Sequence, residues 1–598
     1  MSFDHLGVAG LIPLAIWILL SGLDDLFISL VFCLTRPRSR ILPAEAELAG
    51  AAERRIAIFV PLWQEHRVIE KMLERNLSVI RYQDFDIFVG VYPNDEATVR
   101  AVSQVARLHP RVHLAYCGRP GPTSKGDCLN WIFKGMRTFE EETGERFEIV
   151  TTHDAEDLIH PDSLRLINWF SRRYDMVQVP VLPLPTPFRQ FTHGIYCDEF
   201  AEFQTKDIPV RQRLGGFLPS NGVGTGYSRA ALERLAVQRQ GRIFAPECLT
   251  EDYENGYCLH ALGCRQIFVP VHFEGGEPRA TREYFPRTLR SAIRQRSRWV
   301  AGIVLQGWER QGWRGPRGQT YWFCRDRKGL VGNLLAPLAN LLFFGGMVHY
   351  GLVRRGFAQW HPGYDLPPWL ALFCAATLWL AMTQVGLRTW CCARIYGWPF
   401  ACGVPLRMLW ANVLNSAATA GAIGQYWKAR RNRRTLEWLK TDHVYPAQMA
   451  PQTSRPRLGE ILVKMRCVSM EELEEALANR APGVRIGEHL IISQRITEEN
   501  LYQALSSQAG IPLGMPELGE VNPLVTRLLP VALARRANVI PYRVSGGELH
   551  LVTPEVPSRR IAEELAAASG MGVRFRLVRP PEFLALAQLY LPGGPLPE

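Results

Sequence analysis

Three runs without a charged residue constrain what this chain of 598 residues can fold into more than any other feature. They are Leu6–Leu23, Gly329–Val353 and Leu366–Leu387, with 18, 25 and 22 residues. A helix needs about 20 apolar residues to cross a bilayer. The mean hydropathy of the whole chain is nevertheless −0.07, which is typical of a soluble protein. We therefore expect transmembrane helices attached to large soluble domains.

The excess of positive charge gathers beside these runs. Lys and Arg number 69 against 57 Asp and Glu, and this balance of +12 would by itself allow a nucleic-acid-binding protein. Cytoplasmic flanks of membrane spans also carry basic residues. Here they follow the first run and precede the second: Arg36, Arg38, Arg40, Arg325, Arg327 and Lys328. We expect no nucleic-acid polymer as a partner, an amino terminus outside, and residues 40–328 in the cytoplasm; Arg354 and Arg355, in the short outer loop, oppose this topology.

Two observations narrow the class further. The 13 cysteines lack zinc-finger or CxxC spacing, so we expect neither a disulfide framework nor a structural zinc site. The first residues contain no basic n-region, and their apolar run reaches Asp24 and Asp25 without a clear cleavage site. The first span should therefore remain in the mature protein.

A fourth uncharged stretch, Met408–Trp427, contains several amide and hydroxyl side chains. Lys428 and four arginines follow it, and they would lie outside if the stretch crossed the membrane. We therefore predict an amphipathic helix in the cytoplasmic interface. A fourth span is the alternative.

Residues 50–300 alternate short β-branched runs with helical patterns. The expected strands are Ile56–Val60, Asp86–Tyr92, Val112–Tyr116 and Glu148–Thr152, with helices such as Val68–Ile80 and Asp127–Phe139 between them. This alternation is typical of a Rossmann-like α/β domain with parallel strands. Ligands of such sheets bind beyond the carboxyl ends of the strands.

The chain is expected to have five parts. They are an N-terminal transmembrane segment (1–40), a cytoplasmic α/β domain (41–325), transmembrane helices with the interfacial helix (326–445), a helical repeat (446–515) and a small α/β subdomain (516–598). A proline-containing linker near Tyr445–Pro456 precedes the repeat.

Acidic residues follow the last expected strand. Asp154 and Glu156 are two positions apart where the chain leaves the sheet, and hard oxygen ligands of this kind suit Mg²⁺ or Mn²⁺. Asp157 follows at once, so the residue types leave open which acid would bind a metal. Alone, such a cluster is better explained by a solvated loop, because acidic pairs are common in loops. The sequence Thr250-Glu251-Asp252 follows further on, and Gln295-Arg296-Ser297-Arg298-Trp299 comes 43 residues after Asp252.

In this order, the motifs resemble those of processive family-2 glycosyltransferases of the GT-A fold: an acidic metal motif, TED and QxxRW. Upstream, the segments at 61–65 (PLWQE), Asp95 and 125–130 (KGDCLN) are similar to that family's nucleotide-binding segments. The resemblance covers about residues 50–310 and implies an inverting transfer from a UDP-sugar. It departs from the pattern in the metal motif, which here reads Asp-Ala-Glu.

Inverting transfer needs a base for the acceptor hydroxyl and a cation for the leaving diphosphate. The resemblance implies Asp252 as the base, Asp154 and Glu156 with the metal on the diphosphate, and Asp95 and Asp127 on uridine and ribose. Arg298 would neutralise phosphate, Trp299 would face the acceptor sugar, and Gln295 would hydrogen-bond near either. The expected site is completed by Glu65, Lys125, Thr250, Glu251 and Arg296. The glycine-rich turn Gly222–Gly226 lacks the Lys-Ser/Thr of a P-loop, so we expect it to line the acceptor side.

The C-terminal region contains an internal repeat. Arg457-Leu458-Gly459-Glu460 recurs as Arg485-Ile486-Gly487-Glu488, 28 positions later, and each copy predicts a helix pair. A plain helical repeat with solvated arginines is one interpretation. The pattern also resembles the twin motif of the MshEN domain of secretion and pilus ATPases, which implies cyclic di-GMP binding by Arg457, Leu458, Gly459, Arg485, Ile486, Gly487 and Gln508. Arginine can pair with or stack on guanine.

The whole arrangement resembles the phage-adsorption protein B family, which implies a multi-pass protein of the bacterial inner membrane. We expect it to use a cytoplasmic UDP-sugar, an N-acetylhexosamine among the candidates, to make and export a surface polysaccharide under control of cyclic di-GMP. Its partners would be the donor, a glycan acceptor, membrane lipid and an export partner. Because cyclic di-GMP is cytoplasmic, an even number of spans must separate the two soluble regions. The alternatives are a catalytically silent receptor or scaffold and a transferase that adds one sugar to a lipid-linked acceptor.

Polar residues inside the spans allow two interpretations each. Asp24 and Asp25 could face a glycan path or mark the headgroup boundary. Asn333, Asn340 and Gln384 could line a channel or join helices.

Overall fold

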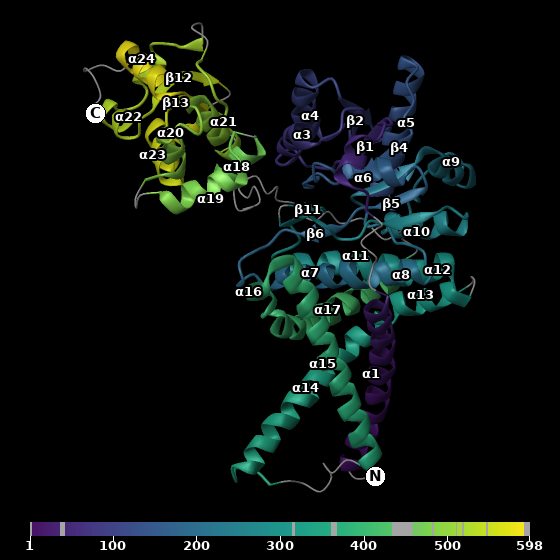
Figure 1. The fold of residues 1–598 in the computed structure, drawn as a ribbon. Coiled ribbons are helices and arrows are strands. Elements are labelled where there is room, and N and C mark those ends of the chain that lie inside the picture. The colour runs from purple at the N-terminus through teal and green to yellow at the C-terminus, as the bar shows by residue number, and fades with distance from the viewer. Residues whose placement is uncertain are drawn as a thin grey trace. The chain divides into compact units, whose positions relative to one another are not determined.

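The computed structural model describes residues 3–35, 42–274, 276–313, 317–359, 367–432, 458–465, 467–480, 484–509, 511–516, 520–545 and 548–590. The chain divides into two compact units, Met1–Gln448 and Met449–Glu598. Both units are shown in Figure 1. Arg457 of the expected cyclic di-GMP site lies outside the described residues.

A seven-stranded sheet forms the centre of the first unit, in the order β3-β2-β1-β4-β7-β5-β8. Its strands are β1 (Ile56–Pro61), β2 (Phe85–Val91), β3 (Val112–Tyr116), β4 (Ile149–Thr152), β5 (Met176–Gln178), β7 (Thr225–Ser228) and β8 (Gln266–Phe268). β7 is antiparallel to β4 and β5, and the other pairs are parallel. The expected Rossmann-like α/β domain is confirmed, and the four expected strands are present within one residue at each end.

Both faces of this sheet are covered by helices. Along β1, Ile56, Ile58 and Val60 belong to one apolar cluster, whereas Ala57 and Phe59 belong to another. This alternation follows from the two-residue period of a strand. The covering helices are α3 (Ile69–Val79), α4 (Glu96–Leu108) and α6 (Ser163–Phe170) on the first face, and α5 (Lys125–Thr143) and α9 (Arg229–Gln238) on the second. Strand β1 is therefore buried on both faces, and its carboxyl end lies where ligands bind in sheets of this kind.

A helical layer separates the sheet from the long helices (Figure 1). It contains α7 (Phe191–Glu202), α8 (Ile208–Arg213), α10 (Glu251–Ala261), α11 (Leu289–Trp299), α12 (Gly307–Gln311), α13 (Arg317–Arg327) and α16 (Trp398–Ala401). Two π-helical segments, η2 (Phe203–Asp207) and η3 (Val300–Gln306), continue α7 and α11. The short strands β6 (Val181–Pro183) and β11 (Thr281–Glu283) pair in parallel between this layer and the sheet. The remaining short elements of this unit are α2 (Glu45–Ala49) and the antiparallel pair β9 (Phe273–Glu274) and β10 (Glu277–Pro278).

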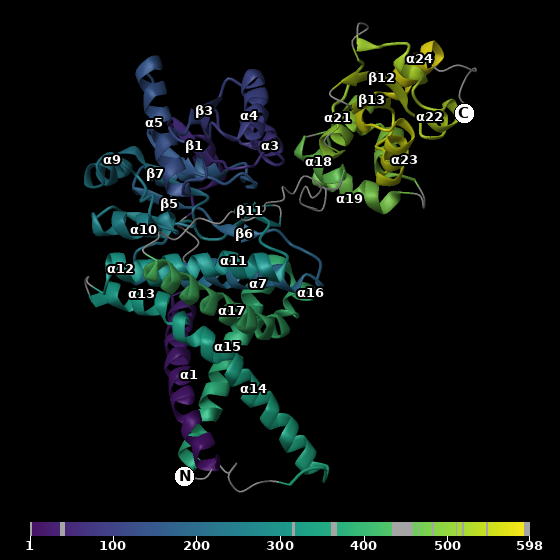
Figure 2. The same ribbon diagram turned by 180° about the vertical axis from the view of Figure 1, so that it is seen from behind.

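Three helices are long and apolar enough to cross a membrane: α1 (Phe3–Leu34) over Leu11–Leu34, α14 (Gly329–Arg354) and α15 (Pro368–Tyr396). The helix α1 continues eleven residues beyond the uncharged run Leu6–Leu23, so Asp24 and Asp25 lie inside it. Figure 2 shows that α14 diverges from α1 and α15, as it also does in Figure 1.

Asp24 and Asp25 do not end the first helix because their charges are neutralised. Lys328 Nζ lies 2.8 Å from Asp24 Oδ2 and 2.7 Å from Asp25 Oδ1. The Arg325 guanidinium contacts both carboxylates, and the Tyr321 hydroxyl donates to Asp24 over 2.6 Å. These bonds attach α1 to the junction between α13 and α14.

The helix α17 (Val404–Arg431) contains the fourth uncharged stretch. Its buried residues Val404, Arg407, Ala411, Leu414 and Ala418 repeat at intervals of three and four, so one face is covered. That face packs on α7, α11 and α14, and Asn333 of α14 donates to Thr419 over 3.1 Å. The helix is not among the three span candidates found in the described part of the chain, and its interfacial placement stays a prediction. Asn333 therefore joins helices.

The second unit has a helical part and a sheet part. The helices α18 (Leu458–Lys464), α19 (Met470–Asn479), α20 (Ile486–Ile492) and α21 (Glu498–Ala509) form the two copies of the repeat. The sheet order is β12 (Ile540–Ser545), β13 (Glu548–Thr553) and β14 (Gly572–Leu577), accompanied by α22 (Val531–Arg536), α23 (Arg559–Ser569), α24 (Pro580–Tyr590) and the 3₁₀ turn η6 (Val525–Arg527).

Candidate active site

A cavity of about 500 Å³ begins at the carboxyl ends of β1 and β4 and reaches α15. We call its two parts the sheet end and the membrane end. The sheet end surrounds Trp63, Lys125, Asp154 and Asp252. The membrane end is lined by Glu199, Glu202, Asp207, Arg211, Asp326 and Arg388. The expected residues that line it are Glu65, Lys125, Asp154, Glu156, Thr250, Glu251, Asp252, Gln295, Arg298 and Trp299. Motifs spread over 235 positions, from Glu65 to Trp299, are therefore brought together.

The acids after β4 divide into two kinds. Asp157 is fully buried, lies 2.8 Å from His153 Nδ1 and accepts a hydrogen bond from the Asp154 backbone N–H over 3.0 Å. Burial raises the pKa of Asp157 to about 6 against the opposing effect of His153. Asp154 and Glu156 line the cavity instead, and Lys125 Nζ lies 2.6 Å from Asp154 Oδ1. Asp157 thus shapes the loop that presents the other two acids.

The TED sequence stands at the start of α10, where Thr250 is the N-cap. Burial and the neighbouring charge of Asp252 raise the pKa of Glu251 to about 8. Burial likewise raises the pKa of Asp252, against the attraction of Lys125. The Asp252 carboxylate lies close to the backbone of Gly222. A side chain at position 222 would prevent this contact, because its Cβ atom would lie 2.6 Å from Asp252 Oδ2, and the φ of Gly222, 78°, also favours glycine. The glycine-rich turn therefore packs on the expected base.

The QRSRW sequence ends α11 and sends its side chains in two directions. Gln295, Arg298 and Trp299 line the cavity, and Gln295 Oε1 and Arg298 Nε have no hydrogen-bond partner in the described part of the chain. Arg296 lies elsewhere: its Nη1 is 2.8 Å from Glu199 Oε2 and 2.6 Å from Asn415 Oδ1. Arg296 therefore fastens α11 to α7 and α17 and is not among the cavity-lining residues.

The expected nucleotide-binding residues also differ in position. Asp95 caps α4, accepting from the Thr98 backbone N–H and, over 2.5 Å, from that of Gln64. Asp127 is buried in the first turn of α5, 3.5 Å from an Arg119 nitrogen. Neither lines the cavity, although both stand beside segments that do.

Sequence reasoning missed several residues that line the cavity. At the sheet end they are Tyr92 and Glu283; Tyr92 lies beside Trp63 of the expected nucleotide-binding segment 61–65, with 5.3 Å between the two rings. Burial, followed by the charges of Asp157, Glu156 and Asp154, raises the pKa of Glu283 well above its usual range. The missed residues at the membrane end are Glu199, Glu202, Asp207, Arg211, Asp326 and Arg388. These positions carry no motif spacing, so only the folded chain brings them to the site.

The membrane end consists of ion pairs. Glu202 lies 2.6 Å from both Lys206 Nζ and Arg388 Nε, which belongs to α15. Arg211 forms two hydrogen bonds with Asp326, of 2.8 and 3.0 Å. Asp207 is 3.5 Å from Arg325 and Lys206. Each acid here has a cation beside it, including Glu199 with Arg296.

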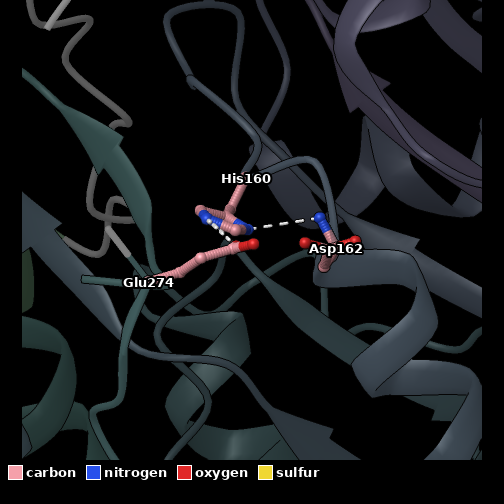
Figure 3. Close-up of side chains that lie close together, drawn as sticks. All are labelled: His160, Asp162 and Glu274. Carbon is pink, nitrogen blue, oxygen red and sulfur yellow. Dashed lines mark hydrogen bonds and ion pairs between the residues drawn. The ribbon is translucent and has the colours of Figure 1, made fainter. Parts of the chain in front are cut away.

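A second group of potential metal ligands lies outside this cavity (Figure 3). His160, Asp162 and Glu274 place ligand atoms within 4.8 Å of one another. Arg81 lies 3.2 Å from Asp162 and 3.6 Å from Glu274, and Arg279 lies 3.3 Å from Glu274. Burial lowers the pKa of His160 to about 4. Because arginines already neutralise the acids, this cluster is an ion-pair network that holds β9 against the loop before α6.

The comparisons with known proteins agree with this geometry. Residues 53–302 match the profile "Glycosyltransferase like family 2", and residues 509–595 match the MshEN domain, on the sheet part of the second unit. The chain is therefore a family-2 glycosyltransferase with an MshEN domain. It belongs to the bacteriophage adsorption protein B family: it is 34% identical to that protein of Escherichia coli (strain K12) over 563 residues, 90% of this chain and 75% of the relative.

Two solved structures are similar in part. The mannosyltransferase PcManGT from Pyrobaculum calidifontis, in complex with GDP-Man and Mn²⁺, is 17% identical and covers 67% of this chain and 99% of its own, with a TM-score of 0.41. The structure of MshE with cdg is 27% identical and covers 22% of this chain and 98% of its own, with a TM-score of 0.21.

Proposed function

We propose that this protein is an inverting glycosyltransferase of the bacterial inner membrane that extends and exports a surface polysaccharide from a cytoplasmic UDP-sugar, under control of cyclic di-GMP. The observation that carries the proposal is the continuity of one cavity from Asp252 and Asp154 to Arg388 at the base of α15. A sugar added at the sheet end has a way toward the membrane helices. The transferred sugar would be a hexose or an N-acetylhexosamine.

Asp252 is assigned as the base that takes the proton of the acceptor hydroxyl. A base works best when its pKa is near the working pH, and burial moves Asp252 in that direction. Arg298 and Lys125 supply positive charge beside it for the leaving diphosphate. Glu65, Trp63 and Tyr92 form the part of the cavity that would hold the nucleoside, with Asp95 and Asp127 fixing the surrounding segments.

The sheet end fits a divalent cation. Glu251, Asp252 and Glu283 have no ion pair within 4.0 Å among the described residues, so carboxylates there outnumber their cations. Asp154 and Glu156 offer the oxygen ligands that Mg²⁺ and Mn²⁺ prefer. A bound cation would neutralise charge on the departing nucleoside diphosphate.

The membrane end fits an uncharged glycan acceptor. Its acids and cations are paired, so it offers no surplus charge to an anionic group. Phe200, Phe285 and Trp299 line the stretch between the two ends and offer the apolar faces on which sugar rings pack. A lipid diphosphate acceptor is disfavoured by the same balance.

Control by cyclic di-GMP is proposed from the repeat and the MshEN match. Gly487 lies against Leu458 of the first copy, where an added Cβ would be 3.1 Å from Leu458 Cδ2, so the starts of α18 and α20 meet. Arg485 is exposed beside them, at the N-cap of α20. Arg457, Gly459, Ile486 and Gln508 complete the proposed ligand set. With α14 and α15 as the two spans between the soluble regions, both would be cytoplasmic, and an outer-membrane or periplasmic partner would receive the glycan.

Membranes that carry the protein test the proposal. We expect radiolabel from at least one UDP-sugar to enter a polymer, with more incorporation when cyclic di-GMP is present. If no UDP-sugar is used while an Asp154/Asp252 double variant retains its cellular role, the protein is a receptor or scaffold instead. A product of one added sugar would identify the single-addition transferase.

A further inference from the structure

Strand β11 brings another carboxylate to the sheet end of the cavity. Arg282 and Leu158 exchange two backbone hydrogen bonds, of 2.8 and 3.1 Å, and Leu158 directly follows the acids at 154–157. Glu283 is the next residue after this bridge and lines the cavity with Asp154 and Glu156. Two segments 125 residues apart in sequence, at Leu158 and Glu283, are thus fixed beside one another by their backbones.

Glu283 differs from Asp154 and Asp157 in having no partner among the described residues. Asp154 is paired with Lys125, and Asp157 with His153. The Glu283 carboxylate makes neither a hydrogen bond nor an ion pair with any described residue, although its backbone C=O accepts from Leu184 over 2.9 Å. The charges that act on it most strongly are those of Asp157, Glu156 and Asp154, which are all negative.

An acid in such surroundings is either protonated or stabilised by a bound cation. Desolvation of an unpaired carboxylate is costly, and buried charges are therefore paired or coordinate metals. Lys125 lies 2.6 Å from Asp154 and acts on Glu283 only as a weaker, more distant charge, without an ion pair among the described residues. Arg298 acts on Glu251 and Asp252.

We infer that Glu283 is a third carboxylate of the divalent-cation site, beside Asp154 and Glu156. The inference rests on the proposed glycosyl transfer and adds a residue that the DAE and TED motifs do not contain. Glu283 is assigned to cation binding and not to the proton transfer, which belongs to Asp252.

Binding of Mn²⁺ to the full-length protein in detergent, measured by electron paramagnetic resonance in the presence of UDP, tests this assignment. Glu283→Gln keeps the size of the side chain and removes its charge, and we expect it to weaken Mn²⁺ binding at least 10-fold. Glu277→Gln is the matched control: it makes the same change on β10, six positions away and outside the cavity, and should bind Mn²⁺ as the unaltered protein does. Glu283→Asp, which keeps the charge, should fall between the two.

The outcomes separate the inference from the proposed function. If Glu283→Gln, with an unchanged melting temperature, binds Mn²⁺ as tightly as the unaltered protein, the inference is overturned while the transferase stands. If the unaltered protein transfers sugar without binding Mn²⁺, the inference and the cation fall together. If Glu283→Gln does not fold, a Glu283→Asp variant that binds Mn²⁺ as tightly as the unaltered protein, with the same thermal shift on adding Mn²⁺ and UDP, would overturn it equally. Mn²⁺ binding that depends on Glu283 in a protein that uses no UDP-sugar would leave the inference in place and refute the proposed donor.

Discussion

The two ends of the cavity contain the same types of charged residue but differ in how their acids are paired. At the membrane end, Glu202, Asp207 and Asp326 each lie within 3.5 Å of a Lys or Arg side chain, so the negative charges there are neutralised. At the sheet end, Glu251, Asp252 and Glu283 have no such partner within the described chain. The paired charges join helices, whereas the unpaired carboxylates belong to the site to which we assign the cation and the base. The difference teaches that burial of charge identifies a site only when the partners are also examined.

Asp252→Asn, at the sheet end, should cause the largest loss of turnover. Loss of the base is expected to lower turnover about 10³-fold, with the melting temperature and UDP binding retained. Radiolabel incorporation by purified protein measures the loss. Asp326→Asn makes the same change at the membrane end and should lower stability while turnover per folded molecule stays within about 10-fold. Equal turnover losses in the two variants would erase the contrast between the ends.

Glu202→Gln, at the membrane end, should lower the free energy of unfolding. It leaves Arg388 without its carboxylate, and removal of one partner of a buried pair costs about 3 kcal/mol. Thermal or denaturant unfolding in detergent measures this cost. Glu96→Gln removes an exposed partner of Arg100 and should cost at most about 0.5 kcal/mol. A Glu202→Gln protein of full stability that has lost transfer would place Glu202 with the catalytic residues.

Arg298→Ala should lower kcat about 10²-fold, because a positive charge beside the leaving diphosphate is lost. Arg296→Ala, two positions earlier, is the matched control and should act on stability through Glu199 and Asn415. Steady-state kinetics together with melting temperatures distinguish the two. A larger kcat effect at Arg296 would reverse their assignments.

The cluster of Figure 3 should behave like the membrane end and contribute to stability alone. Burial keeps His160 neutral, with a folded pKa of about 4 against 6.5 for the free side chain. The unfolded chain therefore binds more protons between these values, and stability should fall by roughly 1–3 kcal/mol as the pH drops through this window. His160→Asn should flatten this fall and leave transfer at pH 7.5 unchanged. Unfolding curves between pH 4 and 7 measure it; an unaltered slope would contradict the assignment.

Local patterns predicted the sheet and the motifs well. β1 to β4 follow from β-branched runs, and TED and QRSRW reach the cavity because strand ends and helix starts place them there. Gly459 and Gly487 were expected at a ligand, yet an added Cβ at each would lie within 2.7 Å of Leu473 or Leu501. Their small size is thus also required by helix packing.

Long-range partners account for what the sequence did not reveal. Asp24 looks like the end of a span because its neutralising groups, Arg325 and Lys328, are 300 positions away. Arg296 belongs to the QxxRW motif but faces α17, whose position depends on the membrane helices. Glu283 carries no motif and reaches the site through a backbone bridge to Leu158.

The bonds between α1 and the start of α14 also impose an order on biosynthesis. When α1 emerges from the ribosome, Asp24 and Asp25 have no counter-ions, and carboxylates inside a membrane are costly. Arg325 and Lys328 follow only after the entire catalytic domain has been made. The first span therefore cannot complete this pairing until the chain has been made as far as Lys328, after the whole catalytic domain.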